Sequence, residues 1–183
     1  GELSPLSVES QTVILKALLK SSREYQLMFY FALFTGARLQ TICTLRIKNL
    51  IGRKPDSQGF IRLPVGSGTG IDTKFQKPMT LLIPNWLAQD LKIYIDSPQA
   101  QQRRQKSSYA DSDENYVFLT KLGTPFYTSK AEQQELIDKI KASDSFGERF
   151  KLYEGEAVRS YLKVVLLPEI RLIDPQFPSF KFH

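Results

Sequence analysis

The sequence predicts an α+β fold that is mainly α-helical and contains a small antiparallel β-sheet. Most long segments place apolar residues at helical spacing, while short β-favouring runs separated by turn residues occupy only 60–83. The chain has 183 residues, of which 42% are hydrophobic, so it is long enough to bury one core. We find no internal repeat and no linker, and we therefore expect one domain over 1–183.

Two capping patterns predict where the first helices begin. Ser7 can cap a helix that runs to about residue 19, with Glu9 in its first turn. The spacing of Ser21 and Glu24 matches a capping box, which predicts that a second helix opens directly after it.

The second helix is expected to be buried on several sides because Tyr25–Phe34 is apolar almost all round. Gly36 can adopt the left-handed backbone that closes a helix. Arg38 then follows at the point where the chain leaves the core. A guanidinium group held there can offer a planar pair of donors to a phosphate, although a surface arginine after a helix cap is the simpler interpretation.

The middle of the chain predicts a short helix and the sheet. Apolar spacing favours a helix over Leu39–Leu45, and three strand-like runs follow at Phe60–Val65, Gly70–Lys74 and Met79–Ile83. Pro84 ends the last run, and Asn85 can cap a helix over Trp86–Ile95.

The remaining segments predict a surface connection and two helices. Residues 97–115 are rich in Gln, Arg, Ser and Asp, which favours a mobile connection. Ser129 can cap a charged helix that runs to about Lys141, and a last helix is expected over Glu154–Leu167, where Pro168 should end it.

Composition points to an anionic partner and away from metals and cofactors. The net charge is +6 and the pI is about 9.4, which favours nucleic acid. With one cysteine, Cys43, and one histidine, His183, soft ligands cannot assemble a zinc site, and no phosphate-binding glycine loop is present. We therefore expect no metal and no cofactor. No apolar run is long enough to cross a bilayer, and no signal segment is visible.

The segment Thr35-Gly36-Ala37-Arg38, with the later residues Ile42, Leu45-Arg46-Ile47 and Asn49-Leu50, resembles the first catalytic motif of the tyrosine recombinases, the phage-integrase family. One position departs from that pattern. The family usually has an acidic residue three places after the arginine, where this chain has Thr41.

A second motif follows in the correct order. The segment Asp72-Thr73-Lys74, with Lys77 and Pro84 further on, resembles the β-hairpin whose lysine reaches the scissile phosphate in that family. Lys74 is the better match, and Lys77 is the alternative because the hairpin length varies.

A third motif would begin at the end of the chain. Phe180-Lys181-Phe182-His183 resembles the residues that lead into the family's His-x-x-Arg box, with His183 as its histidine. The second arginine and the tyrosine nucleophile would lie beyond residue 183. The resemblance thus covers the front two-thirds of a recombinase catalytic domain.

The resemblance implies a helical catalytic domain of the DNA breaking–rejoining type with a small antiparallel sheet. Arg38, Lys74 and His183 would be catalytic, the chemistry would need neither ATP nor metal, and this chain alone would be inactive. Double-stranded DNA would be the partner, together with other recombinase protomers in a tetrameric synapse. The protein would be bacterial or phage-encoded, cytoplasmic and associated with the nucleoid. Basic residues that could contact the DNA backbone are Arg46, Lys77, Arg103 and Arg104.

Two other functions stay open at this point. Thr41 and the missing tyrosine favour a recombinase-like DNA-binding module that has lost catalysis. A helical interaction domain, in which the Thr-Gly-x-Arg match is accidental, is the third alternative.

Overall fold

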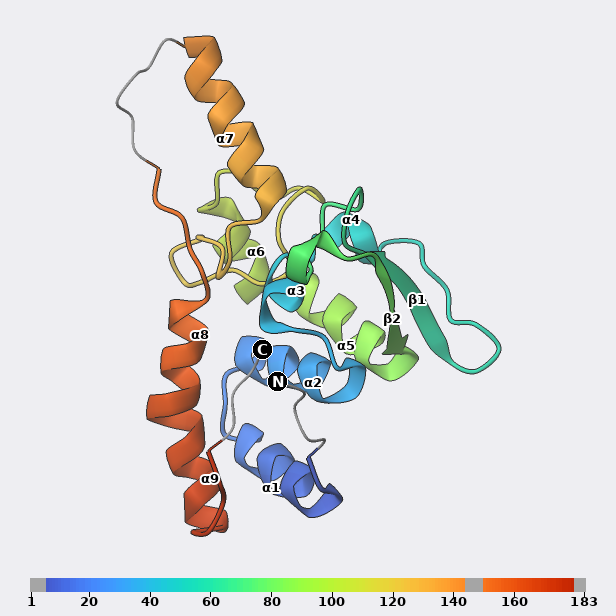
Figure 1. Ribbon diagram of the computed structural model, residues 1–183, viewed down its shortest axis with the longest axis vertical. Helices are drawn as coiled ribbons and strands as arrows, with labels where there is room; N and C mark the ends of the chain where they lie inside the picture. The colour runs from blue at the N-terminus through green and yellow to red at the C-terminus, as the bar shows by residue number, and fades with distance from the viewer. Residues whose placement is uncertain (1–5, 144–149, 180–183) are drawn as a thin grey trace.

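The computed structural model describes residues 6–143 and 150–179 and shows a mixed α and β protein, about half helical, with one small sheet (Figure 1). In these residues the helices are α1 (Val8–Leu18), α2 (Arg23–Thr35), α3 (Leu39–Cys43), α4 (Ile47–Leu50), α5 (Asn85–Ile95), α6 (Pro98–Gln105), α7 (Lys130–Ser143), α8 (Glu156–Tyr161) and α9 (Leu167–Ile173). The strands are β1 (Phe60–Val65) and β2 (Met79–Pro84), with a 3₁₀ turn over Lys74–Gln76 between them. None of the helices described is both long and apolar enough to cross a membrane.

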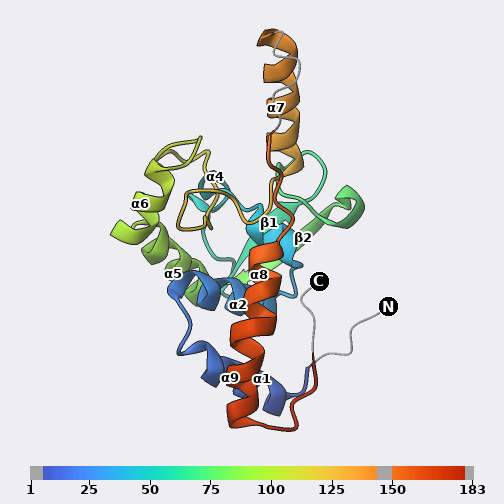
Figure 2. The same cartoon turned by 90° about the vertical axis from the view of Figure 1, so that its left-hand side faces the viewer.

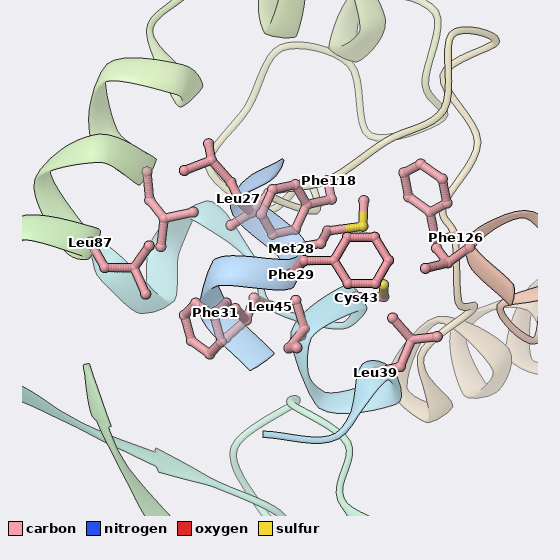
Figure 3. Packing of buried hydrophobic residues seen from close by; sticks show 14 of the residues in the cluster. Leu27, Met28, Phe29, Phe31, Leu39, Cys43, Leu45, Leu87, Phe118 and Phe126 are labelled. Carbon is pink, nitrogen blue, oxygen red and sulfur yellow. The ribbon is translucent and has the colours of Figure 1, made fainter. Parts of the chain in front are cut away.

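Helix α2 lies at the centre of the core. It contacts α1, α3, α5 and β2, and it buries Leu27, Met28, Phe29 and Phe31 almost completely. Figure 3 shows Met28 and Phe29 among Cys43, Phe118 and Phe126, which come from three other segments. Burying one such side chain stabilises the fold by about 1.5–3 kcal/mol, so α2 is the best-anchored element of the chain. This confirms the prediction that 25–34 is buried on several sides.

The local capping signals are confirmed at three helix ends. The Ser7 hydroxyl accepts a hydrogen bond from the backbone N–H of Ser10 (3.1 Å), and the Ser129 hydroxyl accepts one from that of Glu132 (3.1 Å). Gly36 closes α2 in the left-handed conformation with φ 73°. Asn85, by contrast, is the first residue of α5 and Pro84 stands at the cap position.

The sheet has two strands in the described residues, and the expected strand over 70–74 is wrong. β1 and β2 are antiparallel from the Phe60–Pro84 pair to the Val65–Met79 pair. In the segment between them, the backbone groups form hydrogen bonds outside the sheet. The N–H of Asp72 donates to the Thr44 hydroxyl (2.9 Å), and the N–H of Gly66 donates to the carbonyl of Ile71 (2.9 Å). A third strand would need those same groups for pairing.

The segment 97–115 was expected to be a mobile connection, but its first part is helix α6. The Ser97 hydroxyl accepts from the N–H of Ala100 (3.3 Å), and Pro98 occupies the first turn, where its missing N–H has no cost. Arg103 lies on the buried face of α6. Its Nη1 donates to the carbonyl of Leu119 (2.8 Å), and its Nη2 lies 3.4 Å from Oε1 of Glu24 in α2.

The same ion pair explains why the capping-box prediction at Ser21 is wrong. Glu24 is buried and accepts from the Gln99 side chain as well as from Arg103, so it does not return to the start of its own helix. Ser22 stands at the cap position without a side-chain bond, and Ser21 instead accepts from the Tyr161 hydroxyl (2.6 Å).

The last helical segment continues through Pro168, against expectation. α8, a π-helical turn over Leu162–Leu166 and α9 form one continuous rod (Figures 1 and 2), and α9 packs against α1. Proline lacks an N–H and its ring crowds the carbonyl four residues earlier, and a π turn is a common way to absorb such a break. Pro168 then lies in the first turn of α9, where proline is tolerated.

Helix α7 projects from the body of the molecule (Figure 2). None of its described side chains is buried, although Ala131, Leu136 and Ile140 are partly covered. It runs to Ser143, two residues beyond the predicted end.

Arg103→Ala is expected to lower the free energy of unfolding by about 3–5 kcal/mol, because Glu24 would be left buried without its counter-charge. Urea denaturation followed by circular dichroism measures the change. Lys20→Ala is the control, since the ion pair between Lys20 and Glu169 is largely exposed and its loss should cost less than about 1 kcal/mol. Equal effects of the two variants would contradict a structural role for the buried pair.

Candidate functional site

Arg38 is held by a tight turn at the end of the buried helix α2. The N–H of Gly36 donates to the carbonyl of Ala32 (3.0 Å), and the Thr35 hydroxyl accepts from the N–H of Ala37 (3.1 Å). The same hydroxyl donates to the carbonyl of Phe31 (2.6 Å). Arg38 occupies the cap position of α3 and its side chain is exposed. A flexible side chain is therefore attached to a backbone that has little freedom.

The loop between β1 and β2 is closed on itself at Gly66 and Lys77. A Cβ atom at Gly66 would lie 2.4 Å from the carbonyl oxygen of Lys77, and the backbone there has φ 101°, so only glycine fits. The Thr73 hydroxyl donates to the same carbonyl (2.7 Å), and the N–H of Ser67 donates to the carbonyl of Gln76 (3.0 Å). These bonds define a compact turn that presents Lys74 and Lys77 to solvent.

Arg38, Lys74 and Lys77 meet at one hollow of about 390 Å³. Its full lining is Gly36, Ala37, Arg38, Thr41, Thr73, Lys74, Phe75, Lys77, Met79 and Leu81. The lining contains three cationic side chains and no carboxylate, and no ion pair forms at any of the three among the described residues. Unpaired cations around a concave surface attract an anion and can donate hydrogen bonds to its oxygens.

Asp72 links the hairpin to the rest of the site. Its carboxylate is buried, and Oδ2 accepts from Nε2 of Gln40 (3.2 Å) and from the backbone N–H of Lys130 (3.1 Å). It therefore joins the segment before Lys74 to α3 and to the start of α7. The sequence contained no signal for this role, because both partners lie far away in the chain.

The position that is acidic in the family leaves no carboxylate in this hollow. Thr41 is buried in α3 and lines the hollow. Its hydroxyl cannot form an ion pair with Arg38, as a carboxylate would. Among the described residues, Arg38 thus has no carboxylate partner to fix its orientation, and its donors are available to a ligand.

Three of the arginines predicted to contact DNA are turned into the protein, which corrects that prediction. Arg46 is buried against the rings of Tyr109 and Tyr116 (4.8 and 5.2 Å), and its guanidinium donates to the carbonyl of Glu114 (3.1 Å). Arg103 is committed to Glu24. Nε of Arg104 donates to Oδ1 of Asp111 (2.7 Å) and its side chain is also buried. Each of these guanidinium groups is buried and bonded inside the protein, although Nε of Arg46 and Nη1 of Arg104 have no partner among the described residues. A DNA backbone could reach any of them only if the side chain left the interior.

The other groups considered in the sequence analysis do not contribute to the hollow as the structure describes it. His183 lies outside the described residues. Among the described residues, no tyrosine lines the hollow. Cys43 is completely buried, and burial raises the pKa of its thiol, so this thiol is not a nucleophile. Within the described residues, no cluster of His, Cys, Asp or Glu could hold a metal ion.

A larger hollow of about 570 Å³ lies away from these motifs, between α4, α5 and α6. Its lining has Arg53, Lys54, Lys92 and Arg104 but also Asp96 and two more aspartates. Mixed charges with an apolar floor do not select for a polyanion. The smaller hollow is therefore the better candidate site, because its chemistry is of one sign.

Comparison with known proteins adds no assignment, since no family model, no curated protein and no solved structure matches this chain.

The turn that bears Lys74 has an unfavourable backbone. Phe75 and Gln76 adopt left-handed conformations with φ 57° and 55°, which cost about 1–2 kcal/mol for a residue with a side chain. The Phe75 ring is 88% exposed, so it gains almost nothing from burial. Because this strained conformation does not stabilise the fold, its presence in a charged loop favours a role in function.

Phe75→Gly is expected to be more stable than Phe75→Ala by about 1 kcal/mol, because only glycine adopts the left-handed conformation without strain. Thermal unfolding of the two variants measures the difference. Lys139→Gly and Lys139→Ala, on the exposed face of α7, provide the matched control, and there alanine should be the more stable by a similar amount. The same sign at both positions would show that the turn is not strained.

Proposed function

We propose that the hollow lined by Arg38, Lys74 and Lys77 binds a DNA phosphate, and that the chain is part of the catalytic domain of a tyrosine-type site-specific DNA recombinase. The supporting observation is the convergence of three unpaired cations from two separate segments on one hollow without a carboxylate. Those segments are the ones whose sequences resemble the first two recombinase motifs. A chance match of either motif would not require the two to face each other.

The residue types suit transfer of a phosphodiester to a tyrosine. In the proposed reaction, a tyrosine hydroxyl gives its proton to a general base, its oxygen forms a bond to phosphorus, and the bond from phosphorus to the 5′-oxygen breaks. Arg38 donates to the non-bridging oxygens, where negative charge grows in the transition state. The ammonium of Lys74 gives a proton to the departing 5′-oxygen, which leaves as a hydroxyl. Lys77 contributes a second positive charge to the backbone of the DNA.

Arg38 and Lys74 are held in place by different parts of the structure. Arg38 follows a helix packed on four sides, so its backbone does not have to be ordered when DNA binds. Lys74 depends on the closed turn and on Asp72. Such preorganisation is what a site for a transition state requires.

A second candidate function is a DNA-binding module that does not cleave. One observation favours it: Thr41 stands where the recombinase motif usually has an acidic residue, so the hollow has no carboxylate at that position. This module would use the same cations for the same phosphate. The two functions therefore differ in chemistry and agree in binding.

The 183-residue chain is expected to bind double-stranded DNA weakly, with an affinity that falls steeply as salt increases, because the contacts go to phosphates. Fluorescence anisotropy between 50 and 200 mM salt measures it. Arg38→Ala, Lys74→Ala and Lys77→Ala should each reduce the slope of log K against log salt by about 1. Lys16→Ala, on the exposed face of α1, is the control and should leave the slope unchanged. Absence of DNA binding at low salt would refute the proposed function.

Cleavage is expected only in a protein that contains this segment together with the tyrosine, and the chain alone should give no covalent adduct with a nicked substrate. In such a protein Lys74→Ala should slow cleavage by about 10²–10⁴-fold. A 5′-bridging phosphorothiolate leaves without a proton, so it should restore cleavage by Lys74→Ala but not by Arg38→Ala.

Lys77→Ala is the matched control for that experiment. A defect and a rescue at Lys77, with none at Lys74, would move the general acid to Lys77. If the protein that contains this segment together with the tyrosine binds DNA but never forms a phosphotyrosyl adduct, the second candidate function is correct.

A further inference from the structure

Phe75 is the most exposed large apolar side chain in the part of the chain that the structure describes. It lies at the tip of the turn between β1 and β2, on the lining of the hollow and between the two lysines of that turn. The Nζ atom of Lys74 lies 5.3 Å from the centroid of its ring. An aromatic ring in water beside a cation cluster needs an explanation that the phosphate site does not supply.

The turn holds this ring outward at a cost. A bulky residue with φ 57° is an outlier, and the next residue is left-handed as well. The geometry is enforced by the bonds that Thr73 and Ser67 make to the carbonyls of Lys77 and Gln76. Nothing in the core gains from this arrangement, because the ring is not packed against it. The strain is therefore compatible with a role in contact with a ligand.

We propose that Phe75 inserts its ring between adjacent base pairs of duplex DNA, next to the phosphate held by Arg38 and Lys74. The inference rests on the proposed function and adds the part of the DNA that this turn contacts. Apolar side chains that enter a base step unstack it and bend the duplex, and cations on either side can hold the flanking phosphates. Lys74 and Lys77 stand on the two sides of Phe75 in this turn. The ring would thereby deform the DNA beside the bond that is to be cleaved.

The neighbouring charges favour DNA over a lipid surface. A membrane anchor normally uses several apolar side chains on one face, whereas this turn offers one ring between lysines. The adjacent hollow is concave and holds Arg38, which suits a single tetrahedral phosphate. A contact between Phe75 and anionic lipid is nevertheless a separate outcome of the test below.

The test uses the 183-residue chain and a short duplex that carries 2-aminopurine at a TA step, which is easily unstacked. Fluorescence of 2-aminopurine increases when the base is unstacked, and anisotropy of an end label reports binding. The unaltered chain should bind and raise the 2-aminopurine signal. Phe75→Ala should bind about tenfold more weakly, lose that signal and keep the same salt slope. Phe75→Leu should retain part of the signal, since leucine can also act as a wedge.

Phe150→Ala is the matched control, because Phe150 is also exposed but lies outside the hollow. It should leave both signals unchanged. The unaltered chain could bind with a steep salt slope while the 2-aminopurine signal does not change, or changes equally in Phe75→Ala. Either result would overturn the insertion of Phe75 into the base step and leave the proposed phosphate site unaffected. If the chain does not bind DNA at all, the proposed function itself fails. A loss of binding to anionic lipid vesicles in Phe75→Ala, without any effect on DNA, would assign the ring to a membrane surface and overturn the inference.

Discussion

The burial of α2 is the constraint on which the candidate site depends. Because nearly every face of this helix is apolar, it has to be covered by α1, α3, α5 and β2. That packing fixes the point at which the chain leaves the core. Gly36 reverses the backbone there, and Arg38 follows at once. The burial of α2 thus determines where Arg38 lies, although the side chain of Arg38 is exposed and takes no part in the core.

The other half of the site is positioned by polar contacts. Asp72 joins the hairpin to Gln40 in α3 and to the first residue of α7. A buried carboxylate that loses such partners is costly, so these bonds hold the loop strongly in place. Since Arg38 stands at the cap position of α3, the two segments with the cations share one support. Their relative position therefore depends on this support and on the closed turn that bears Lys74, whose tip is exposed and strained.

Much of the fold could be predicted from the sequence because its signals are local. The Ser7 and Ser129 caps, the glycine turn at Gly36 and the periodicity of the helices each involve residues close together in the chain. Helix α6 was missed because its buried positions carry Arg103 and an adjacent arginine, which resemble a solvated surface. The partners of Arg103 lie in other segments of the chain, and the partner of the adjacent arginine, Asp111, lies beyond the end of the helix. Two motifs singled out Arg38 and Lys74, but the hollow that they share, the role of Asp72 and the conformation of Phe75 follow from tertiary contacts.

The basic residues form two populations, and net charge alone does not distinguish them. Arg103 and Arg104 have carboxylate partners, and Arg46 is held by two tyrosine rings, Ser129 and a carbonyl. An anion that approached any of these would have to displace an internal partner and expose a buried group. Arg38, Lys74 and Lys77 have no carboxylate partner among the described residues, and no carboxylate lines their hollow. An anion entering there breaks no ion pair among the described residues, so its attraction to the three cations is not offset by the loss of a carboxylate partner. This difference, more than the excess of +6, favours the hollow over the buried arginines as the proposed phosphate site.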